Sequence, residues 1–362
     1  MNFDLNFYKN KKVFVTGITG FKGAWLCKIL KKFGAEVTGY SLKPHTNPSL
    51  YELAEIGEDV QSVIGDIRDY KTLKKAFDLS QPEIVFHLAA QPIVRDSYKD
   101  PAYTYETNVM GTVNILECIR NSNCVKSFVN ITTDKVYLNK EWNCGYRENE
   151  ELDGFDPYSN SKSCSELVTH SYQRSFFADR DIAISTARAG NVIGGGDWAL
   201  DRLIPDCIRG INSGIKIEIR NPIAVRPWQH VLEPLSGYLL LGQKLLEDGH
   251  KYADGFNFGP QEESVLTVAE VAKKVTEFYG KGEVFVGEPS PLHEAGLLML
   301  NIEKAEKVLN WIPTLTADKA IKNTVEWYKH FYNKDFDMYI YTINQIREYE
   351  ELIKWNKSYV IK

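Results

Sequence analysis

Residues 128–137 of this 362-residue chain have the sequence FVNITTDKVY, and the expected fold follows from this stretch. The apolar run at 128–131 is typical of a buried parallel strand. The carboxyl ends of strands in open α/β sheets face the ligand crevice. Here that end carries two hydroxyls, a carboxylate and an amine at residues 132–135. A strand needs none of these groups to fold, so they indicate a site.

A glycine-rich turn follows the first predicted strand, residues 12–16. Gly17 would permit a tight turn, Gly20 would let the backbone approach a pyrophosphate, and Gly23 would let a helix pack closely. We expect that helix at about residues 21–33, with phosphates at its N-terminus. Strand, glycine triplet and helix together predict a dinucleotide-binding unit.

The next two predicted strands end near residues that could hold the rest of a dinucleotide. The second, residues 36–40, runs into Ser41 and Lys43 and carries no Asp or Glu for the ribose hydroxyls. Lys43 could instead meet a 2′-phosphate, so the choice between NAD and NADP stays open. The third, residues 62–65, precedes Asp66, which could accept from an adenine amine or cap a helix.

The fourth predicted strand, residues 83–91, contains His87, which we interpret as a packed strand residue. The small Ala89 and Ala90 suit close approach to a cofactor. Apolar residues at helical spacing then predict one long helix over residues 101–119.

Tyr158 and Lys162 are predicted to lie one turn apart on the same helix face. Asp156 and Pro157 before them are typical of an N-cap and a first helical position. The pKa of an isolated tyrosine is about 10, too high for a base at neutral pH. A nearby ammonium and a positive nicotinamide ring would both lower it. A coincidental pair on a solvated face is the alternative.

The remaining chain predicts a second lobe. A sixth strand at 182–187 leads into a glycine-rich loop at 188–198, and helices are expected at about 232–247, 267–279 and 318–332. Arg202 and Arg226 with nearby Trp228 would suit a nucleotide diphosphate, because guanidinium binds phosphate at two points. A surface salt bridge is the alternative for Arg202.

These patterns predict an α/β protein: a Rossmann-like doubly wound parallel sheet with a smaller C-terminal α/β substrate lobe. The NAD-binding domain would span 1–188, with a returning segment near 229–260. The sugar-nucleotide-binding lobe would take 189–228 and 261–335. Residues 336–362 would add a helical extension.

Composition narrows the class of protein. A net charge of −5 argues against nucleic acid as a partner. No apolar run approaches the roughly 20 residues of a membrane helix, and the N-terminus lacks signal-peptide features. Six scattered cysteines without a C-x-x-C pair predict reduced thiols in a cytoplasmic protein. No metal-ligand spacing is present, so no metal site is expected.

Seven segments together resemble the extended short-chain dehydrogenase/reductase family, and within it the NAD-dependent sugar-nucleotide 4,6-dehydratases. They are residues 16–25, 132–137, 146–149, 156–162, 188–197, 226–230 and 257–260. The pair Asp134-Lys135 is the most specific mark, since other sugar-nucleotide dehydratases of the family commonly have Asp-Glu there. The resemblance therefore implies NAD as cofactor and CDP-glucose as substrate, with cytidine resting on the subgroup match alone.

The resemblance also implies a mechanism. NAD would take a hydride from C4 of the hexose while Tyr158 removes the 4-hydroxyl proton, Lys162 supplies charge and Thr133 hydrogen-bonds the same oxygen. Lys135 would then remove the C5 proton, Asp134 would protonate the departing 6-hydroxyl, and the hydride would return to C6. Adjacent strand residues point to opposite faces, so Asp134 and Lys135 are expected beyond the regular strand, in the turn.

The expected site has three sets of residues. The catalytic set is Thr133, Asp134, Lys135, Tyr158 and Lys162. The cofactor-binding set is Gly17, Thr19, Gly20, Phe21, Lys22, Gly23, Ser41, Asp66, Ile67, Leu88, Ala89, Ala90, Gln91, Asn108, Thr132, Tyr158 and Lys162. The substrate-binding set is Gln91, Arg95, Asn191, Arg202, Arg226, His230 and Asn257.

Two departures from the family pattern stand out. Ile18 occupies a position where histidine is usual in this subgroup, and residues 293–300 lack the family's more polar pattern. We expect a changed grip on the cofactor from the first, and the second leaves the form of the substrate pocket at that segment open.

Alternative functions remain open. A sugar-nucleotide 4-epimerase would keep Tyr158 and Lys162 but would not need an elimination pair, and a dehydratase could act on another nucleotide sugar. A dinucleotide-sensing regulator would usually lose the Tyr-x-x-x-Lys pair. By analogy, we expect a homodimer or a tetramer, formed through apolar stripes on the helices at 104–119 and 159–174.

Overall fold

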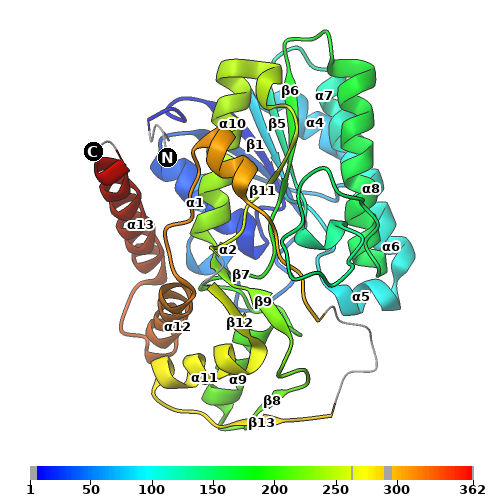
Figure 1. The fold of residues 1–362 in the computed structure, drawn as a ribbon. Helices are drawn as coiled ribbons and strands as arrows, with labels where there is room; N and C mark the ends of the chain where they lie inside the picture. Colours follow the sequence, from blue (N-terminus) through cyan, green and yellow to red (C-terminus); the bar gives the residue numbers. More distant parts are fainter. Residues whose placement is uncertain (1–5, 262–263, 289–295, 361–362) are drawn as a thin grey trace.

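The strands of the main sheet all run parallel, so their carboxyl ends lie at the same edge of the sheet. The structure, a computed structural model, describes residues 6–261, 264–288 and 296–360. Within these residues a seven-stranded parallel sheet has the order β11-β6-β5-β4-β1-β2-β3 (Figure 1). Its strands are β1 (Lys12–Thr16), β2 (Glu36–Ser41), β3 (Gln61–Ile64), β4 (Ile84–His87), β5 (Ser127–Ile131), β6 (Ala183–Arg188) and β11 (Gly255–Asn257).

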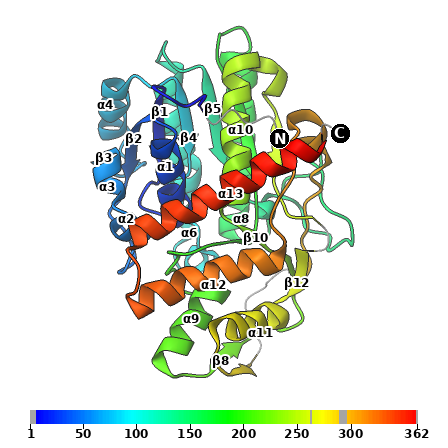
Figure 2. The same cartoon turned by 90° about the vertical axis from the view of Figure 1, so that its left-hand side faces the viewer.

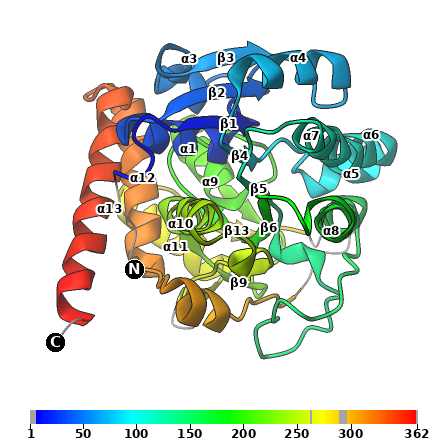
Figure 3. The ribbon, with the colours of Figure 1, turned by 90° about the horizontal axis from the view of Figure 1, so that it is seen from above.

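Helices cover both faces of this sheet, as Figure 3 shows. One face is covered by α1 (Phe21–Lys32) and α10 (Leu232–Asp248), and the other by α4 (Tyr70–Ser80), α7 (Gly111–Arg120) and α8 (Pro157–Tyr172). The buried apolar residues accordingly form two large clusters, one around Trp25 and Leu239 and the other around Leu73 and Ile115. The predicted doubly wound sheet is confirmed.

The second lobe lies beyond the carboxyl ends of the strands (Figure 1). Its helices are α9 (Leu203–Ser213), α11 (Val268–Tyr279) and α12 (Ala317–Asn333). Three short strand pairs complete it: β7 (Val192–Ile193) with β10 (Gln229–His230), β8 (Ile217–Ile219) with β13 (Val284–Val286), and β9 (Val225–Pro227) with β12 (Val265–Thr267). The pair β9–β12 is antiparallel and the other two are parallel.

The last helix, α13 (Met338–Val360), runs beside α12 and across the α1–α10 face (Figure 2). Lys32 of α1 pairs with Glu350 at 2.6 Å, and Trp327 Nε1 of α12 donates to Thr342 Oγ1 at 3.0 Å. On α10, the buried Glu233 accepts a hydrogen bond from Tyr349 at 2.7 Å. The predicted C-terminal helix is therefore part of the packed structure and not a loose extension.

The sequence missed some local detail. The helix expected over 101–119 consists of α6 (Pro101–Tyr105), a π-helical turn (Glu106–Met110) and α7. The fourth strand ends at His87, earlier than predicted: the Leu88 amide still reaches the carbonyl of Thr16 at 3.2 Å, but the Ala89 amide turns to the hydroxyl of Thr16 at 3.1 Å. The short helices α2 (Leu50–Leu53), α3 (Ile56–Asp59) and α5 (Val94–Lys99) were not predicted, and neither were the 3₁₀ turn Gly249–Tyr252 and the π-helical turns Gln173–Phe177 and Ala305–Leu309.

Among the described residues, none of the helices combines the length and the apolar character needed to cross a membrane.

Candidate active site

A cavity of about 710 Å³ lies at the carboxyl ends of β1, β2, β4, β5 and β6. This volume is in the range of small-molecule and cofactor sites. Gly17, Ser41, Ala89 and Thr132 line it from the sheet, and Arg202 lines it from the second lobe. The cavity therefore lies where the strand-end chemistry of the sequence predicted a crevice.

The turn after β5 carries three of the predicted catalytic residues. The strand ends at Ile131, and residues Asp134–Val136 form a single 3₁₀ turn that Thr133 caps. Thr133 Oγ1 donates to Asp134 Oδ1 at 2.8 Å, and Lys135 Nζ lies 3.6 Å from the same oxygen. Asp134 and Lys135 thus lie beyond the regular strand, as expected, and both line the cavity.

The Asp134 carboxyl is buried, and of its two oxygens only Oδ1 has a hydrogen-bond partner among the described residues. Its residue has 0% exposure, and Oδ2 has no hydrogen-bond partner among the described residues. The side-chain amide nitrogen of Asn191, Nδ2, is also buried and has no hydrogen-bond partner among the described residues, and Asn191 lines the same cavity. Gly190 packs directly on the carboxyl, since a Cβ there would lie 1.8 Å from Asp134 Oδ2. A buried polar atom without a partner is costly, so both atoms suit a bound polar ligand.

Helix α8 brings Tyr158 and Lys162 to the same cavity. Asp156 caps the helix by accepting from the amide of Ser159 at 3.0 Å, which confirms the predicted N-cap. Lys162 Nζ donates to the carbonyl of Ile131, the last residue of β5, at 3.1 Å. This hydrogen bond ties the helix to the strand that ends in the catalytic turn.

Burial dominates the electrostatics of this pair. Burial raises the pKa of Tyr158 to about 12, although a hydrogen bond with Thr133 and the charge of Arg202 act in the opposite direction. Burial lowers the pKa of Lys162 to about 8. Among the groups of the chain itself, desolvation of the phenolate thus outweighs the nearby cation, and the expected lowering of the tyrosine pKa, which also invoked a bound nicotinamide ring, stays a prediction.

The glycine-rich turn forms a cradle that fits the phosphates of a dinucleotide. Gly17 has φ +81°, and a Cβ there would lie 2.8 Å from the amide nitrogen of Ala89. At Gly20 a Cβ would meet only the carbonyl of Gly17, at 3.4 Å, so its cavity side is open. Gly20 is the N-cap of α1 and provides no side-chain cap. The first amides of this helix are thus available to an anion.

The β2 end has its own hydrogen bonds. Thr19 Oγ1 lies 2.7 Å from Ser41 Oγ and donates to the carbonyl of Leu42 at 2.9 Å. Asp66 does not cap the following helix, because Asp69 does so. The Asp66 carboxylate instead accepts from Arg68, with Nη2 of Arg68 2.8 Å from Oδ2 of Asp66. Of the two interpretations of Asp66, the structure therefore excludes the helix cap.

Cations surround the cavity. Burial lowers the pKa of Lys22 to about 7, and the positive charge of Arg202 adds to this effect. Arg202 Nη1 pairs with Asp197 Oδ2 at 2.6 Å, and Arg95 pairs with Asp201 at 3.2 Å. Arg226 donates to the carbonyl of Val225 at 2.8 Å and lines the same wall. This arrangement suits a ligand with several phosphate charges.

Three of the predicted site residues lie off the cavity wall. Asn108 is buried and clasps the backbone of Gln91, accepting from its amide at 2.8 Å. Asn257 accepts from the Tyr137 hydroxyl at 2.8 Å. His230 is fully buried beside the ring of Trp25, and burial lowers its pKa to about 3. Each of these side chains contacts other protein groups behind the cavity wall, so none of them is among the proposed contacts with the cofactor or the substrate.

All other predicted site residues line the cavity. They are Gly17, Thr19, Gly20, Phe21, Lys22, Gly23, Ser41, Asp66, Ile67, Leu88, Ala89, Ala90, Gln91, Arg95, Thr132, Thr133, Asp134, Lys135, Tyr158, Lys162, Asn191, Arg202 and Arg226. His87 does not line it and is a packed strand residue, with Nδ1 2.8 Å from Thr16 Oγ1.

The two departures from the family pattern differ in whether they reach the cavity: Ile18 does not line it, and Leu298 does. Ile18 is buried away from the cavity against Gly39, where a Cβ would come within 2.4 Å of the isoleucine. Of the segment 293–300, His293, Glu294 and Ala295 lie outside the described residues. Leu298 is buried in a cluster with Val136 and Tyr137 and also lines the cavity.

Sequence reasoning missed two features. The segment after β2 contributes His45, Thr46 and Ser49 to the cavity wall, and no pattern in it pointed there. The second is a buried ion pair behind the wall, Glu166 with Arg188, at 2.9 Å. Glu166 follows Lys162 by four residues on the same helix, and that spacing was a usable signal.

The fold and the cavity define an α/β enzyme of the Rossmann class, in which the glycine-rich turn and the acid–base side chains line the same cavity. The family model described as GDP-mannose 4,6 dehydratase matches residues 14–324. The CDP-glucose 4,6-dehydratase of Salmonella typhimurium is 47% identical over 353 residues, covering 96% of this chain and 98% of that protein. The chain belongs to the GDP-mannose 4,6-dehydratase family, which confirms the resemblance that its motifs suggested.

Solved structures show the same fold. The dTDP-glucose 4,6-dehydratase of Bacillus anthracis, in complex with NAD, has a TM-score of 0.73 at 22% identity and covers 88% of this chain and 96% of its own. The UDP-glucose 4-epimerase of Thermotoga maritima, with UDP-glucose, has a TM-score of 0.77 at 23% identity, covering 88% and 99%.

Proposed function

We propose that this chain catalyses the NAD-dependent 4,6-dehydration of CDP-glucose to CDP-4-keto-6-deoxyglucose. The observation that carries the proposal is the buried Asp134 carboxyl, next to Lys135 and on the same cavity as Tyr158 and Lys162. An epimerase has no use for this acid and amine beside the tyrosine. The 47% identity to a CDP-glucose 4,6-dehydratase over almost the whole chain supports the same reaction.

The cofactor proposal rests on the phosphate cradle. The open side of Gly20 and the uncapped start of α1 fit a pyrophosphate, and Thr132, Ala89 and Ala90 would lie along the nicotinamide half. When bound, NAD accepts a hydride from C4 of the hexose and returns it to C6. Lys43, the residue that could meet a 2′-phosphate, is exposed at the rim, and we propose NAD over NADP on the family's precedent.

Tyr158 would take the proton of the 4-hydroxyl. With a pKa of about 12, the phenol is almost wholly protonated at neutral pH, so a cation bound beside it is needed to stabilise the phenolate, which is its basic form. Thr133, which already hydrogen-bonds the phenol, would orient the same hydroxyl of the sugar. Lys162, fixed to the carbonyl of Ile131, would keep a positive charge next to the developing ketone.

Asp134 and Lys135 would perform the elimination. A ketone at C4 acidifies the C5 proton, which the neutral amine of Lys135 can remove. The hydroxyl on C6 needs an acid as it departs, and Asp134 can supply that proton only in its protonated form. Oδ2, buried and without a partner among the described residues, is the oxygen available for this transfer.

The cations would hold the nucleotide diphosphate of the substrate. Arg202, Arg226 and Arg95 reach the cavity from three different segments, and guanidinium groups bind phosphate oxygens at two points. The amide nitrogen of Asn191 is available for a sugar or phosphate oxygen. Cytidine as the base rests on the relative from Salmonella typhimurium.

We also propose a homodimer in the cytoplasm. Met110 and Leu167 are 51% and 53% exposed on the neighbouring helical segments before α7 and on α8, where two copies could pair as a four-helix contact. The six cysteines are free thiols, as a reducing compartment requires. Light scattering should give twice the chain mass for the wild type and a monomer for Leu167→Glu; a wild-type monomer would contradict the dimer.

A panel of CDP-, dTDP-, GDP- and UDP-linked glucose or mannose tests the function. The proposal expects a 4-keto-6-deoxy product, which absorbs in alkali, from CDP-glucose with the highest kcat/KM. An isomeric hexose as the product would instead identify a 4-epimerase. A different preferred nucleotide would keep the dehydration and refute the base assignment.

A further inference from the structure

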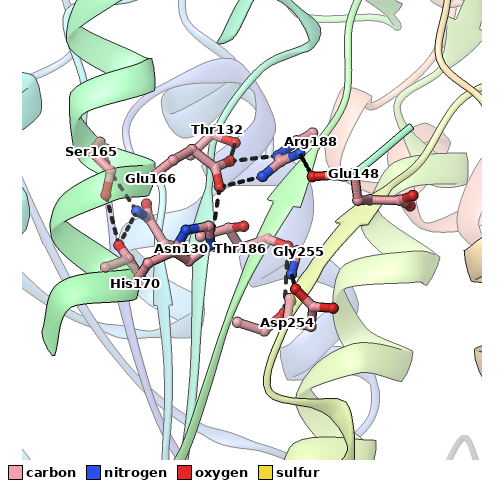
Figure 4. A network of polar contacts seen from close by, with 12 residues as sticks. Asn130, Thr132, Glu148, Ser165, Glu166, His170, Thr186, Arg188, Asp254 and Gly255 are labelled. Carbon is pink, nitrogen blue, oxygen red and sulfur yellow. Dashed lines mark hydrogen bonds and ion pairs between the residues drawn. The ribbon is translucent and has the colours of Figure 1, made fainter. Parts of the chain in front are cut away.

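A buried ion pair lies directly behind the catalytic turn, and the proposed mechanism does not use it. Glu166 of α8 and Arg188 at the end of β6 are 0% and 1% exposed, and neither lines the cavity. They meet at two points, with Arg188 Nε 3.0 Å from Oε1 and Nη2 2.9 Å from Oε2 (Figure 4). Burial opposes the ionised carboxylate, but the guanidinium outweighs it and keeps the pKa of Glu166 below its usual value.

The pair holds both ends of the catalytic turn. Thr132, the residue before the turn, donates its hydroxyl to Glu166 Oε1. Tyr137, the residue after the turn, accepts a hydrogen bond at its hydroxyl from Arg188 Nη1 at 2.7 Å. Residues 133–136 therefore lie between two side chains that are bound to one ion pair, and the hydroxyl of Ser163 on α8 also donates to the carbonyl of Val136 at 2.7 Å. Asp134 and Lys135 lie in the middle of this segment.

The same pair also fixes the other catalytic groups. Glu166 follows Lys162 by one helical turn and Tyr158 by two, so it registers α8 against the turn. Arg188 precedes Gly190 by two residues, and Gly190 packs on the Asp134 carboxyl. The pair thus contacts three elements, α8, the turn and the end of β6, in addition to the hydrogen bond of Lys162 with Ile131 and the pairing of β5 with β6.

Stability alone does not account for this arrangement. Replacing a buried ion pair with apolar side chains is often neutral or stabilising, whereas losing one partner leaves a buried charge. A positioning role explains why charged groups lie here. It also shows which variants are informative: those that release the turn but leave the pair intact.

We propose that the Glu166–Arg188 pair is a positioning device for the elimination step, setting where Asp134 and Lys135 stand relative to Tyr158. The proposal rests on the proposed function. In the step concerned, the Lys135 amine takes the C5 proton, the C5–H electron pair forms the C5–C6 double bond, and the C6–O bond breaks. The departing oxygen takes its proton from Asp134 and leaves as water.

Tyr137→Phe is the sharpest variant. It removes the hydroxyl, which accepts from Arg188 and donates to Asn257 Oδ1 at 2.8 Å, but keeps the ring, which stacks on Tyr146 with centroids 5.2 Å apart. Arg188 keeps both contacts to Glu166 and a hydrogen bond to the carbonyl of Glu148 at 3.0 Å. Thr132→Val, the second variant, releases the other end of the turn.

Thr169→Val is the matched control. Thr169 is buried on the same helix and accepts from Asn130 Nδ2 at 2.9 Å, but it holds no residue of the turn. The change from threonine to valine is the same as at residue 132. A general loosening of the α8 network would therefore appear in the control as well.

The experiment follows single turnover of CDP-glucose by the NAD-loaded enzyme, recording reduced-nicotinamide absorbance and 4-keto-6-deoxy product together. A displacement of about 1 Å at the turn lowers a rate by up to about 100-fold. For Tyr137→Phe we expect elimination to slow by about 10- to 100-fold, so reduced nicotinamide accumulates. The oxidation rate and KM should stay within about twofold of wild type.

Each outcome of this experiment decides a separate point. Accumulation in Tyr137→Phe or Thr132→Val, but not in Thr169→Val, supports the positioning role. If both steps slow in proportion, or if the two turn variants match the wild type, the proposal is overturned. If Tyr137→Phe does not fold, as thermal unfolding would show, Thr132→Val decides by the ratio of its elimination rate to its own oxidation rate, because Thr132 also lines the proposed nicotinamide site. A wild type that releases no keto-deoxy product refutes the proposed function instead.

Discussion

Gly190→Ala probes the position of the Asp134 carboxyl without touching it. A Cβ at residue 190 would lie 1.8 Å from Asp134 Oδ2, whereas real Cβ atoms essentially never come closer than 3.0 Å to another heavy atom. The carboxyl must therefore move by at least the difference, 1.2 Å. The backbone at residue 190 cannot easily yield, because Gln229 Nε2 donates to the Gly190 carbonyl at 3.2 Å.

A shift of this size has a predictable cost. A misplacement of about 1 Å at a reacting group lowers the rate about 100-fold, which corresponds to about 2.7 kcal/mol in the barrier. The kcat for the 4-keto-6-deoxy product from CDP-glucose should fall by this factor in Gly190→Ala. The NAD affinity, measured by titration calorimetry, should stay within about twofold, because the cradle at Gly17 and Gly20 is separate.

Two further variants test whether the loss of activity comes from the displaced Asp134 carboxyl. Gly259→Ala is the matched control, since a Cβ there meets only Ile302 and Leu300 at 3.4 and 3.5 Å. In an Asp134→Ala background, Gly190→Ala should add little, because the clashing carboxyl is gone. A folded Gly190→Ala enzyme with kcat within threefold of wild type would refute the reasoning. So would an equal loss in the two backgrounds.

Three other variants address separate parts of the account. Tyr158→Phe should bind NAD normally but lose about 10²- to 10⁴-fold in kcat, the usual contribution of a positioned base; retained turnover would exclude the phenol as base. Lys135→Ala should oxidise CDP-glucose and stop there, with reduced nicotinamide visible in the absorbance spectrum; steady product release would show that another group takes the C5 proton. Burial raises the pKa of Glu233 to about 7 from an ordinary 4.5, so its contribution to stability is complete below pH 4.5 and is lost as the pH rises through 7. Urea unfolding at pH 5 and 7.5 should therefore show wild type losing about 2 kcal/mol relative to Glu233→Gln, and parallel pH profiles would contradict this.

The sheet was predictable because its strands are short apolar runs that end abruptly at glycine or polar residues. Residues 12–16 are followed by Gly17, and residues 128–131 by the polar turn, so both the strand and its functional end are visible locally. The α8 N-cap at Asp156 was predictable for the same reason. Errors arose where a tertiary hydrogen bond overrode the local pattern, as when the amide of Ala89, shortly after His87, bonds the Thr16 hydroxyl and not a neighbouring strand.

The site was less predictable than the fold. The family resemblance placed Asn108, His230 and Asn257 near the cavity, but it could not tell that their side chains turn into the interior. The Tyr158 pKa depends on burial, which the spacing of Tyr158 and Lys162 does not encode. The Glu166–Arg188 pair joins residues 22 positions apart across two elements, so only the folded chain reveals that it holds the turn.

The most direct test of the central claim is to follow one hydrogen from C4 of the hexose. With CDP-[4-²H]glucose, oxidation, elimination and reduction in a single cavity predict that the label reaches C6 of the keto-deoxy product, while C5 gains hydrogen from solvent. A product without label at C6, or an isomeric hexose that keeps the label at C4, would contradict the account.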